Sequence, residues 1–263
     1  MARQFWDLRS DELEQAARKG CVIVIPVGQV EQHGPHLPVS TDVDIVVRLS
    51  ERAADLTAGE VPTLIMPPIW AGFSGREVAR WPGTIRVRTR VVMDLTLDIC
   101  RSLVEMGFRK LVVVTSHGQH TALMEVVARE LADAAQVHAA VVPVAKIAAE
   151  AVRRHRRSEL GGCLHGGEFE TSLMLHFGRP VDMSRASARD RLKYHSRFLP
   201  GDAFPPTTGL AYVSTWGIQR SETGAYGDPT TATPETGAAI FEETAAELAA
   251  FLREYYQLPP EPG

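Results

Sequence analysis

The stretch that decides both the fold and the site is VIVIPVGQVEQHGPHLPVSTD, residues 22–42. Its first six residues, Val22–Val27, form the apolar run expected of a strand that is buried on both faces of a parallel sheet. Glu31, His33 and Asp42, three good metal-ligand types, then crowd the turn-rich segment at the end of that strand. Because α/β proteins build their active sites at this edge of the sheet, the stretch predicts a metalloenzyme.

The same alternation of strands and helices continues along the chain. Helical spacing is present at 43–54, 91–106, 121–136 and 235–256, and apolar strand-like runs lie at 63–67, 110–115 and 137–143. A short helix begins at Ser10, where we expect the serine to be the N-cap, and Gly20 stops it. This order implies a parallel sheet covered by helices on both faces.

One α/β domain over residues 1–263 is expected, with a long loop region at 198–234 that is rich in Pro, Gly and Thr. Loops of this length commonly form lids, binding loops or subunit contacts.

Composition excludes several classes of protein. The 263 residues are 44% hydrophobic and 23% charged with a formal net charge of −4, which is ordinary for a globular protein and gives no case for nucleic-acid binding. The one basic run, residues 153–157, is read as a solvated helix end. We see neither a spanning helix nor a signal peptide, so we expect no membrane partner and a cytoplasmic location. The cysteines are three and far apart, which favours reduced, packed thiols.

Two further segments carry histidine at places where a strand or loop gives way to a helix. TSHGQH, residues 115–120, follows the buried strand at 110–115, so His117 should reach the same sheet edge as Glu31 and His33. The other is HGGEFETS, residues 165–172, where glycine follows His165. Four histidines stand outside any motif and are read as surface or packed residues: His138, His155, His176 and His195.

The mixture of imidazole and carboxylate indicates the kind of metal. It suits borderline divalent cations such as zinc, manganese or iron, whereas an all-oxygen set would suit magnesium or calcium. Five or so ligands with several carboxylates are more than one tetrahedral ion needs, so two metal ions are favoured over one.

These motifs resemble those of the creatininase (creatinine amidohydrolase) family, in order over most of the chain. The family's Glu-Gln-His-Gly-Pro-His-Leu-Pro motif with a later Asp is met by residues 31–38 and Asp42. The remaining family elements are met, the second only partly, by Pro82-Gly83-Thr84, His117-Gly118, the segment 165–172 and Gly227-Asp228-Pro229.

The resemblance implies a three-layer α/β/α fold, a homo-oligomer that is often a hexamer, and two divalent metals that activate water to hydrolyse a small amide. By motif position, Asp42 looks like the bridging ligand, Glu31 and His117 would hold one metal, and His33 the other. We expect Glu168 to complete the second site and take part in catalysis, with Glu170 as the alternative. His165 would steady the tetrahedral intermediate or shuttle a proton to the leaving nitrogen. Candidate substrate-binding residues are Ser74, Gln119, His120 and Trp216.

Departures from the family pattern bear on the substrate. Creatininase carries a Trp-Asp pair shortly before the histidine that matches His165, whereas this chain has Gly161-Gly162-Cys163-Leu164. We therefore expect a member of the family other than creatininase itself. A formamidopyrimidine deformylase, a ring-opening hydrolase of a cyclic sugar derivative, a peptide-trimming enzyme of the mycofactocin kind and a non-catalytic metal-binding subunit all stay open.

Overall fold

A five-stranded, entirely parallel sheet forms the centre of the protein, with strand order β1-β3-β2-β4-β5. The computed structural model describes residues 3–205, 209–213 and 219–259. The strands are β1 (Arg3–Gln4), β2 (Val22–Val27), β3 (Thr63–Ile65), β4 (Lys110–Thr115) and β5 (His138–Pro143). The helices are α1 (Ser10–Arg18), α2 (Thr41–Leu56), α3 (Thr89–Glu105), α4 (Thr121–Ala135), α5 (Val144–Ile147), α6 (Ala149–His155), α7 (Glu168–His176) and α8 (Pro234–Tyr256).

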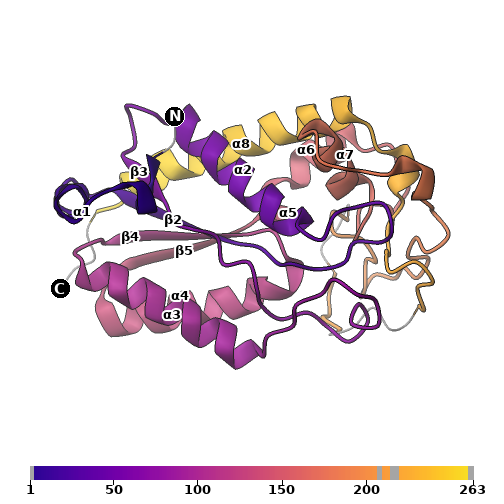
Figure 1. Cartoon of the computed structure of the whole chain (residues 1–263), viewed down its shortest axis with the longest axis horizontal. Helices are drawn as coiled ribbons and strands as arrows, with labels where there is room; N and C mark the ends of the chain where they lie inside the picture. The colour runs from indigo at the N-terminus through magenta and orange to yellow at the C-terminus, as the bar shows by residue number, and fades with distance from the viewer. Residues whose placement is uncertain (1–2, 206–208, 214–218, 260–263) are drawn as a thin grey trace.

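Helices cover both faces of the sheet and make the three-layer α/β/α architecture that was expected (Figure 1). On one face α8 packs against α2, α6 and α7, and on the other α3 packs against α4. The side chains of β2 alternate between the two cores. Val22 and Val24 join the core under α2 and α8, whereas Ile23 and Ile25 join the core under α3 and α4. Burial on both faces explains why this strand has no polar residue.

The predicted elements are confirmed with shifts of a few residues at their ends. The N-cap of α1 differs, because the helix already includes Ser10 and the capping contact is made by Glu12, whose carboxylate accepts the backbone N–H of Arg9 at 3.1 Å. The edge strand β1 and the short helices α5 and α6 were not predicted; they are two to seven residues long, too short for a periodic pattern. The described part of the 198–234 loop region contains one 3₁₀ turn, Pro229–Thr231, and no strand.

The ends of the two central strands lie side by side. Val27 at the end of β2 pairs with Thr115 at the end of β4, so Glu31 and His117 leave the sheet at the same edge. The N-termini of α2 and α7 bring acidic residues, with Asp42 in the first turn of α2 and Glu168 and Glu170 in the first turn of α7. A helix N-terminus stabilises negative charge, so these carboxylates are placed favourably.

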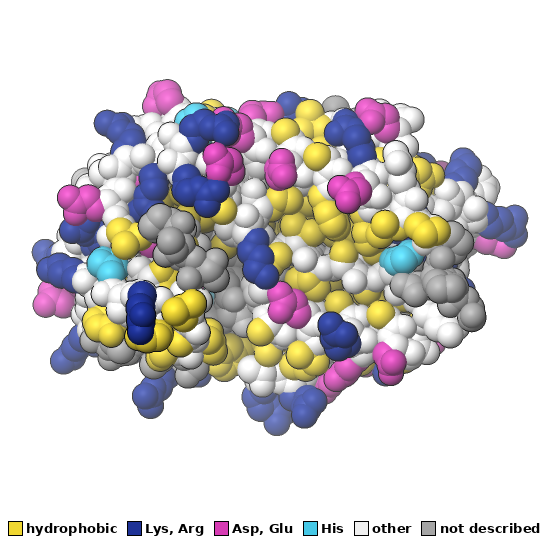
Figure 2. Space-filling model, turned by 180° about the vertical axis from the view of Figure 1, so that it is seen from behind, with side chains coloured by type: hydrophobic (Ala, Val, Ile, Leu, Met, Phe, Trp, Pro, Cys, Tyr) yellow, Lys and Arg dark blue, Asp and Glu magenta, His cyan; other side chains and the backbone are white. Residues whose placement is uncertain are grey.

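The molecular surface has mixed chemistry. On the face drawn in Figure 2, Lys and Arg side chains are interspersed with acidic and apolar ones. The basic run at 153–157 lies at the end of α6 and is neutralised in part, since Arg153 and Arg154 pair with Glu150 and Arg154 also pairs with Glu243. Within the described residues, none of the helices combines the length and the apolar character needed to cross a membrane.

Candidate metal centre

Asp42 is shared by two of three overlapping groups of largely buried potential ligands. These two groups are Glu31, Asp42 and His117, and His33, Asp42 and Glu170; the third consists of Glu31, His33 and His165, and within each group the ligand atoms all lie within 4.8 Å of one another. Oδ2 of Asp42 is 3.2 Å from Nδ1 of His117, and Oδ1 is 3.5 Å from Nε2 of His33. Each oxygen of the Asp42 carboxylate therefore faces a different histidine.

The two histidines are held so that one defined nitrogen faces the cluster. Nε2 of His117 lies 3.1 Å from the carbonyl oxygen of Phe73, which leaves Nδ1 toward Asp42 and Glu31. In His33 the roles are exchanged: Nδ1 lies 2.9 Å from the carbonyl oxygen of Glu31, and Nε2 faces Asp42. Metal-binding histidines usually donate their other N–H to a carbonyl or carboxylate in this way.

The two acids of α7 lie in different surroundings. Glu170 joins the cluster, with Oε1 3.8 Å from Nε2 of His33 and Oε2 accepting the backbone N–H of Gly166 at 2.6 Å. Glu168 is fully buried elsewhere: its two oxygens accept the backbone N–H groups of Arg157 and Ser158, both at 2.7 Å. Both Glu168 oxygens hold a turn, and among the described residues Glu170 is the acid of α7 that falls in a group of candidate ligands.

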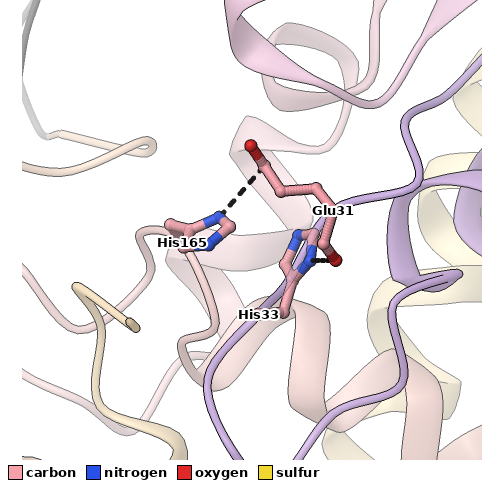
Figure 3. Close-up of side chains that lie close together, drawn as sticks. All are labelled: Glu31, His33 and His165. Atoms are coloured by element: carbon pink, nitrogen blue, oxygen red, sulfur yellow. Dashed lines mark hydrogen bonds and ion pairs between the residues drawn. The ribbon is translucent and has the colours of Figure 1, made fainter. Parts of the chain in front are cut away.

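His165 lies beside Glu31 and His33. Its Nδ1 lies 3.6 Å from Oε2 of Glu31, and its ring faces that of His33 with 4.2 Å between centroids (Figure 3). Gly166 follows in the left-handed conformation with φ of 66°, and a Cβ there would lie 2.7 Å from the carbonyl oxygen of His33. Glycine is therefore required for the chain to pass close enough to bring His165 into the site.

Close contacts between buried carboxylates and imidazoles shift the pKa values of the site residues. Burial disfavours a charged imidazole, but Asp42 and Glu170 outweigh it and raise the pKa of His33 to about 10. In the same way Glu31 and Asp42 raise the pKa of His117 to about 9 against the effect of burial. Burial raises the pKa of Glu170 to about 7, although His33 lowers it.

The pKa of His165 is lowered, whereas those of His33 and His117 are raised. Burial, reinforced by the charge of His33, holds the pKa of the His165 ring well below its ordinary value. The ring is therefore neutral.

Buried ligand atoms without hydrogen-bond partners show that the residues fit metal ions. Within the described residues, both carboxylate oxygens of Glu31, Oδ2 of Asp42 and Nε2 of His33 are buried and have no such partner. Leaving polar atoms in this state is costly, and nearly all buried polar groups are paired in native proteins. A cavity of about 90 Å³ opens onto His33, Asp42, His117 and Glu170. Borderline divalent cations would satisfy this mixed nitrogen and oxygen donor set.

The predicted substrate-binding residues fall into different settings. Ser74 is buried, and its hydroxyl accepts the side-chain amide of Gln29 at 2.9 Å. Gln119 is occupied at both ends, because it accepts the N–H of Gly75 at 2.8 Å and donates to Glu77 at 2.9 Å. Trp216 lies outside the described residues.

His120 packs edge-on against the His117 ring, with 4.6 Å between centroids, and is fully buried. Burial, reinforced by the charge of His117, lowers the pKa of its ring to about 3.

One participant was missed at the level of sequence. Gln32 touches His165 through its side-chain amide, with 3.3 Å between Nε2 of Gln32 and Nε2 of His165. Its position between Glu31 and His33 in the first motif was the available signal, but it was read only as part of the family pattern.

Comparison with known proteins identifies the family to which this chain belongs. A sequence model of the creatininase (creatinine amidohydrolase) family matches residues 6–252. The mycofactocin precursor peptide peptidase of Mycobacterium tuberculosis is 33% identical over 251 residues, which cover 91% of this chain and 86% of that protein. The creatinine amidohydrolase of Pseudomonas putida is 28% identical over 263 residues, or 94% of this chain and 93% of that protein. A solved mutant creatininase of Zn–Zn type shares the fold with a TM-score of 0.80 at 24% identity, covering 98% of this chain and 100% of that one. Since both the family model and the peptidase span nearly its whole length, this chain is a hydrolase that belongs to the creatininase family.

Proposed function

We propose that this hydrolase holds two divalent metal ions and cleaves a C–N bond of an amide with water. The observation that carries the proposal is the position of Asp42, whose two carboxylate oxygens face His117 and His33 separately. One site consists of Glu31, Asp42 and His117, and the other of His33, Asp42 and Glu170. Zinc, manganese and iron all suit these ligands.

Two such ions supply Lewis acidity and make a water molecule nucleophilic near neutral pH. The chain supplies the rest. Glu31 and Asp42 are buried carboxylates that balance the positive charge of the ions, and the carbonyls of Phe73 and Glu31 orient the two histidine ligands. His165 is neutral and lies beside Glu31, so its ring is suited to pass a proton to the departing nitrogen.

Among amides, a peptide bond is the first substrate to test. The peptidase is more similar to this chain than the creatinine amidohydrolase is, at 33% against 28% identity. Gly161–Leu164 also stand where creatininase carries its Trp-Asp pair, so the pocket wall differs from that of an enzyme specific for creatinine.

The proposal is tested by hydrolysis with controlled metal content. Protein loaded with zinc, manganese or ferrous ion is incubated with short unblocked peptides, formamides and creatinine, and the products are identified by mass spectrometry. We expect cleavage of an amide, loss of cleavage on treatment with a chelator, and recovery when metal is restored. Two equivalents of bound metal with no hydrolysis across the panel would contradict the enzymatic proposal and favour a non-catalytic metal-binding subunit.

A homo-oligomer, up to a hexamer, belongs to the same proposal. Strand β5 lies at an edge of the sheet, and a groove of about 1220 Å³ runs beside it, lined by residues of α4 and by Ala139 and Val141 of β5. Open sheet edges are usually covered in native assemblies. Light scattering coupled to size-exclusion chromatography measures the mass directly, and a monomer would contradict this part of the proposal.

A further inference from the structure

The side chain of Gln32 is fixed at both ends by the backbone. Its Oε1 accepts the N–H of Gly34 at 2.9 Å, and its Nε2 donates to the carbonyl oxygen of Gly224 at 3.0 Å. Only 4% of the residue is exposed. The two ends of an amide are not interchangeable here, because a backbone N–H requires an acceptor and a backbone carbonyl requires a donor. The amide nitrogen of Gln32 must therefore be the end that faces His165.

This orientation decides which nitrogen of His165 accepts a hydrogen bond. Nε2 of Gln32 lies 3.3 Å from Nε2 of His165, and the amide nitrogen can only donate. Nε2 of the imidazole must then be the unprotonated acceptor, since two N–H groups cannot face each other. In a neutral ring the hydrogen is then on Nδ1, the nitrogen that lies 3.6 Å from Oε2 of Glu31.

We propose that Gln32 is a positioning residue that fixes the His165 ring with its Nδ1–H directed into the metal centre. This inference rests on the proposed function, in which His165 passes a proton to the departing nitrogen. Gln32 would determine which ring nitrogen carries that proton. Glu31, His33 and His165 lie close enough to hold an ion between them. A ring whose Nδ1 carries hydrogen has no lone pair there for a metal ion, so the Gln32 contact would keep His165 from acting as a ligand through that nitrogen. It presents a donor to the reacting atoms instead.

The turn at residues 221–224, whose Gly224 carbonyl accepts from Gln32, is itself held by hydrogen bonds. Oδ2 of Asp190 accepts the side-chain hydroxyl of Ser221 at 3.0 Å and the backbone N–H of Thr223 at 2.7 Å. The Ser221 hydroxyl in turn accepts the N–H of Gly224 at 2.8 Å. The carbonyl that orients Gln32 thus belongs to a hydrogen-bonded turn, and the orientation is supported from two parts of the chain.

The test is nitrogen NMR of the imidazole groups in zinc-loaded protein labelled with ¹⁵N-histidine, with the His165 signals assigned by their loss in His165→Asn. We expect the wild type to carry hydrogen on Nδ1. In Gln32→Glu the group facing His165 becomes an acceptor, so the hydrogen should move to Nε2. In Gln32→Met no hydrogen bond is offered, so the preference for Nδ1 should be lost.

The matched control is Gln29→Glu, which changes a buried glutamine three residues earlier whose amide donates to Ser74 and Ile85. It should leave the His165 hydrogen on Nδ1. Thermal melts and zinc content establish that each variant is folded and loaded. Hydrogen on Nε2 in the wild type, or retention on Nδ1 in both Gln32 variants, would overturn the inference. Failure of the proposed function would look different, as absence of hydrolysis in protein whose His165 signals still respond to Gln32.

Discussion

Glu168 and Glu170 lie two residues apart in the first turn of α7, yet their carboxylates serve different parts of the molecule. Glu168 accepts two backbone N–H groups from residues 157 and 158, whereas Glu170 faces Nε2 of His33. Successive residues on a helix point about 100° apart, so two acids at this spacing diverge by about 200°. One therefore holds a turn and the other is available to a metal ion.

Replacing these two acids separates the two roles. Glu170→Gln should reduce bound zinc from two equivalents to one and abolish hydrolysis, because the amide is a neutral and weaker ligand. Glu168→Gln should keep two equivalents and cost about 1.5–3 kcal/mol of stability, because an amide cannot accept from both N–H groups. Metal analysis and urea unfolding measure the two effects. Loss of metal in Glu168→Gln with full loading of Glu170→Gln would reverse the assignment.

Asp42→Asn should be the most severe single ligand change, since it weakens both sites at once. We expect both zinc equivalents to be lost and hydrolysis to fall by more than about 100-fold, beyond the loss typical of residues that only orient ligands. His33→Ala and His117→Ala should each lose one equivalent. Asp44→Asn is the matched control, because Asp44 lies two residues on in α2 and pairs with Arg179 at 3.0 Å. Equal metal loss in Asp44→Asn would contradict the assignment of Asp42 as a ligand to both ions.

The metal-free and metal-loaded proteins should respond oppositely to pH. In the metal-free protein the pKa values of His33 and His117 are raised to about 10 and about 9, so their charged forms stabilise the folded state fully below pH ~6.5. That contribution is lost as pH rises through 9 to 10, and the melting temperature should fall by several degrees. Zinc requires both rings unprotonated, so binding should release protons and strengthen with pH. Parallel melting curves with and without zinc would contradict this account.

Gly72 and His120 should show strong energetic coupling. A Cβ at position 72 would overlap the imidazole of His120, so Gly72→Ala should cost about 1–3 kcal/mol through overpacking. His120→Asn shortens the buried side chain and should recover part of that cost in the double variant. A double-mutant cycle read by urea unfolding gives the coupling free energy. Additive effects would show that the two residues do not share the space.

Much of the fold could be predicted because each strand that builds the sheet centre is a continuous apolar run. Parallel pairing then places the carboxyl ends of these strands, and with them Glu31 and His117, at one edge of the sheet; the structure pairs Val27 with Thr115 there. The first motif could be read as a ligand set for the same reason: its residues are close in sequence and follow directly from a strand. The short strand β1 carries only two residues and offers no pattern to read.

The details of the site depend on contacts between distant segments of the chain, and the sequence pattern does not predict such contacts. The use of Glu168 is decided by a turn ten residues earlier, which no helix pattern specifies. The partner of Gln32 lies 133 residues away and the carbonyl that orients it lies 192 residues away. Sequence therefore indicated which residues are chemically suited to the site, and tertiary structure decides which of them face it.

If Asp42 joins two metal sites, anomalous diffraction from zinc-loaded crystals will locate both ions beside its carboxylate. We expect two zinc peaks roughly 3.5–4 Å apart with the Asp42 carboxylate between them. Glu31 and His117 should lie on one side, and His33 and Glu170 on the other. A single peak, or two peaks that do not share Asp42, would contradict it.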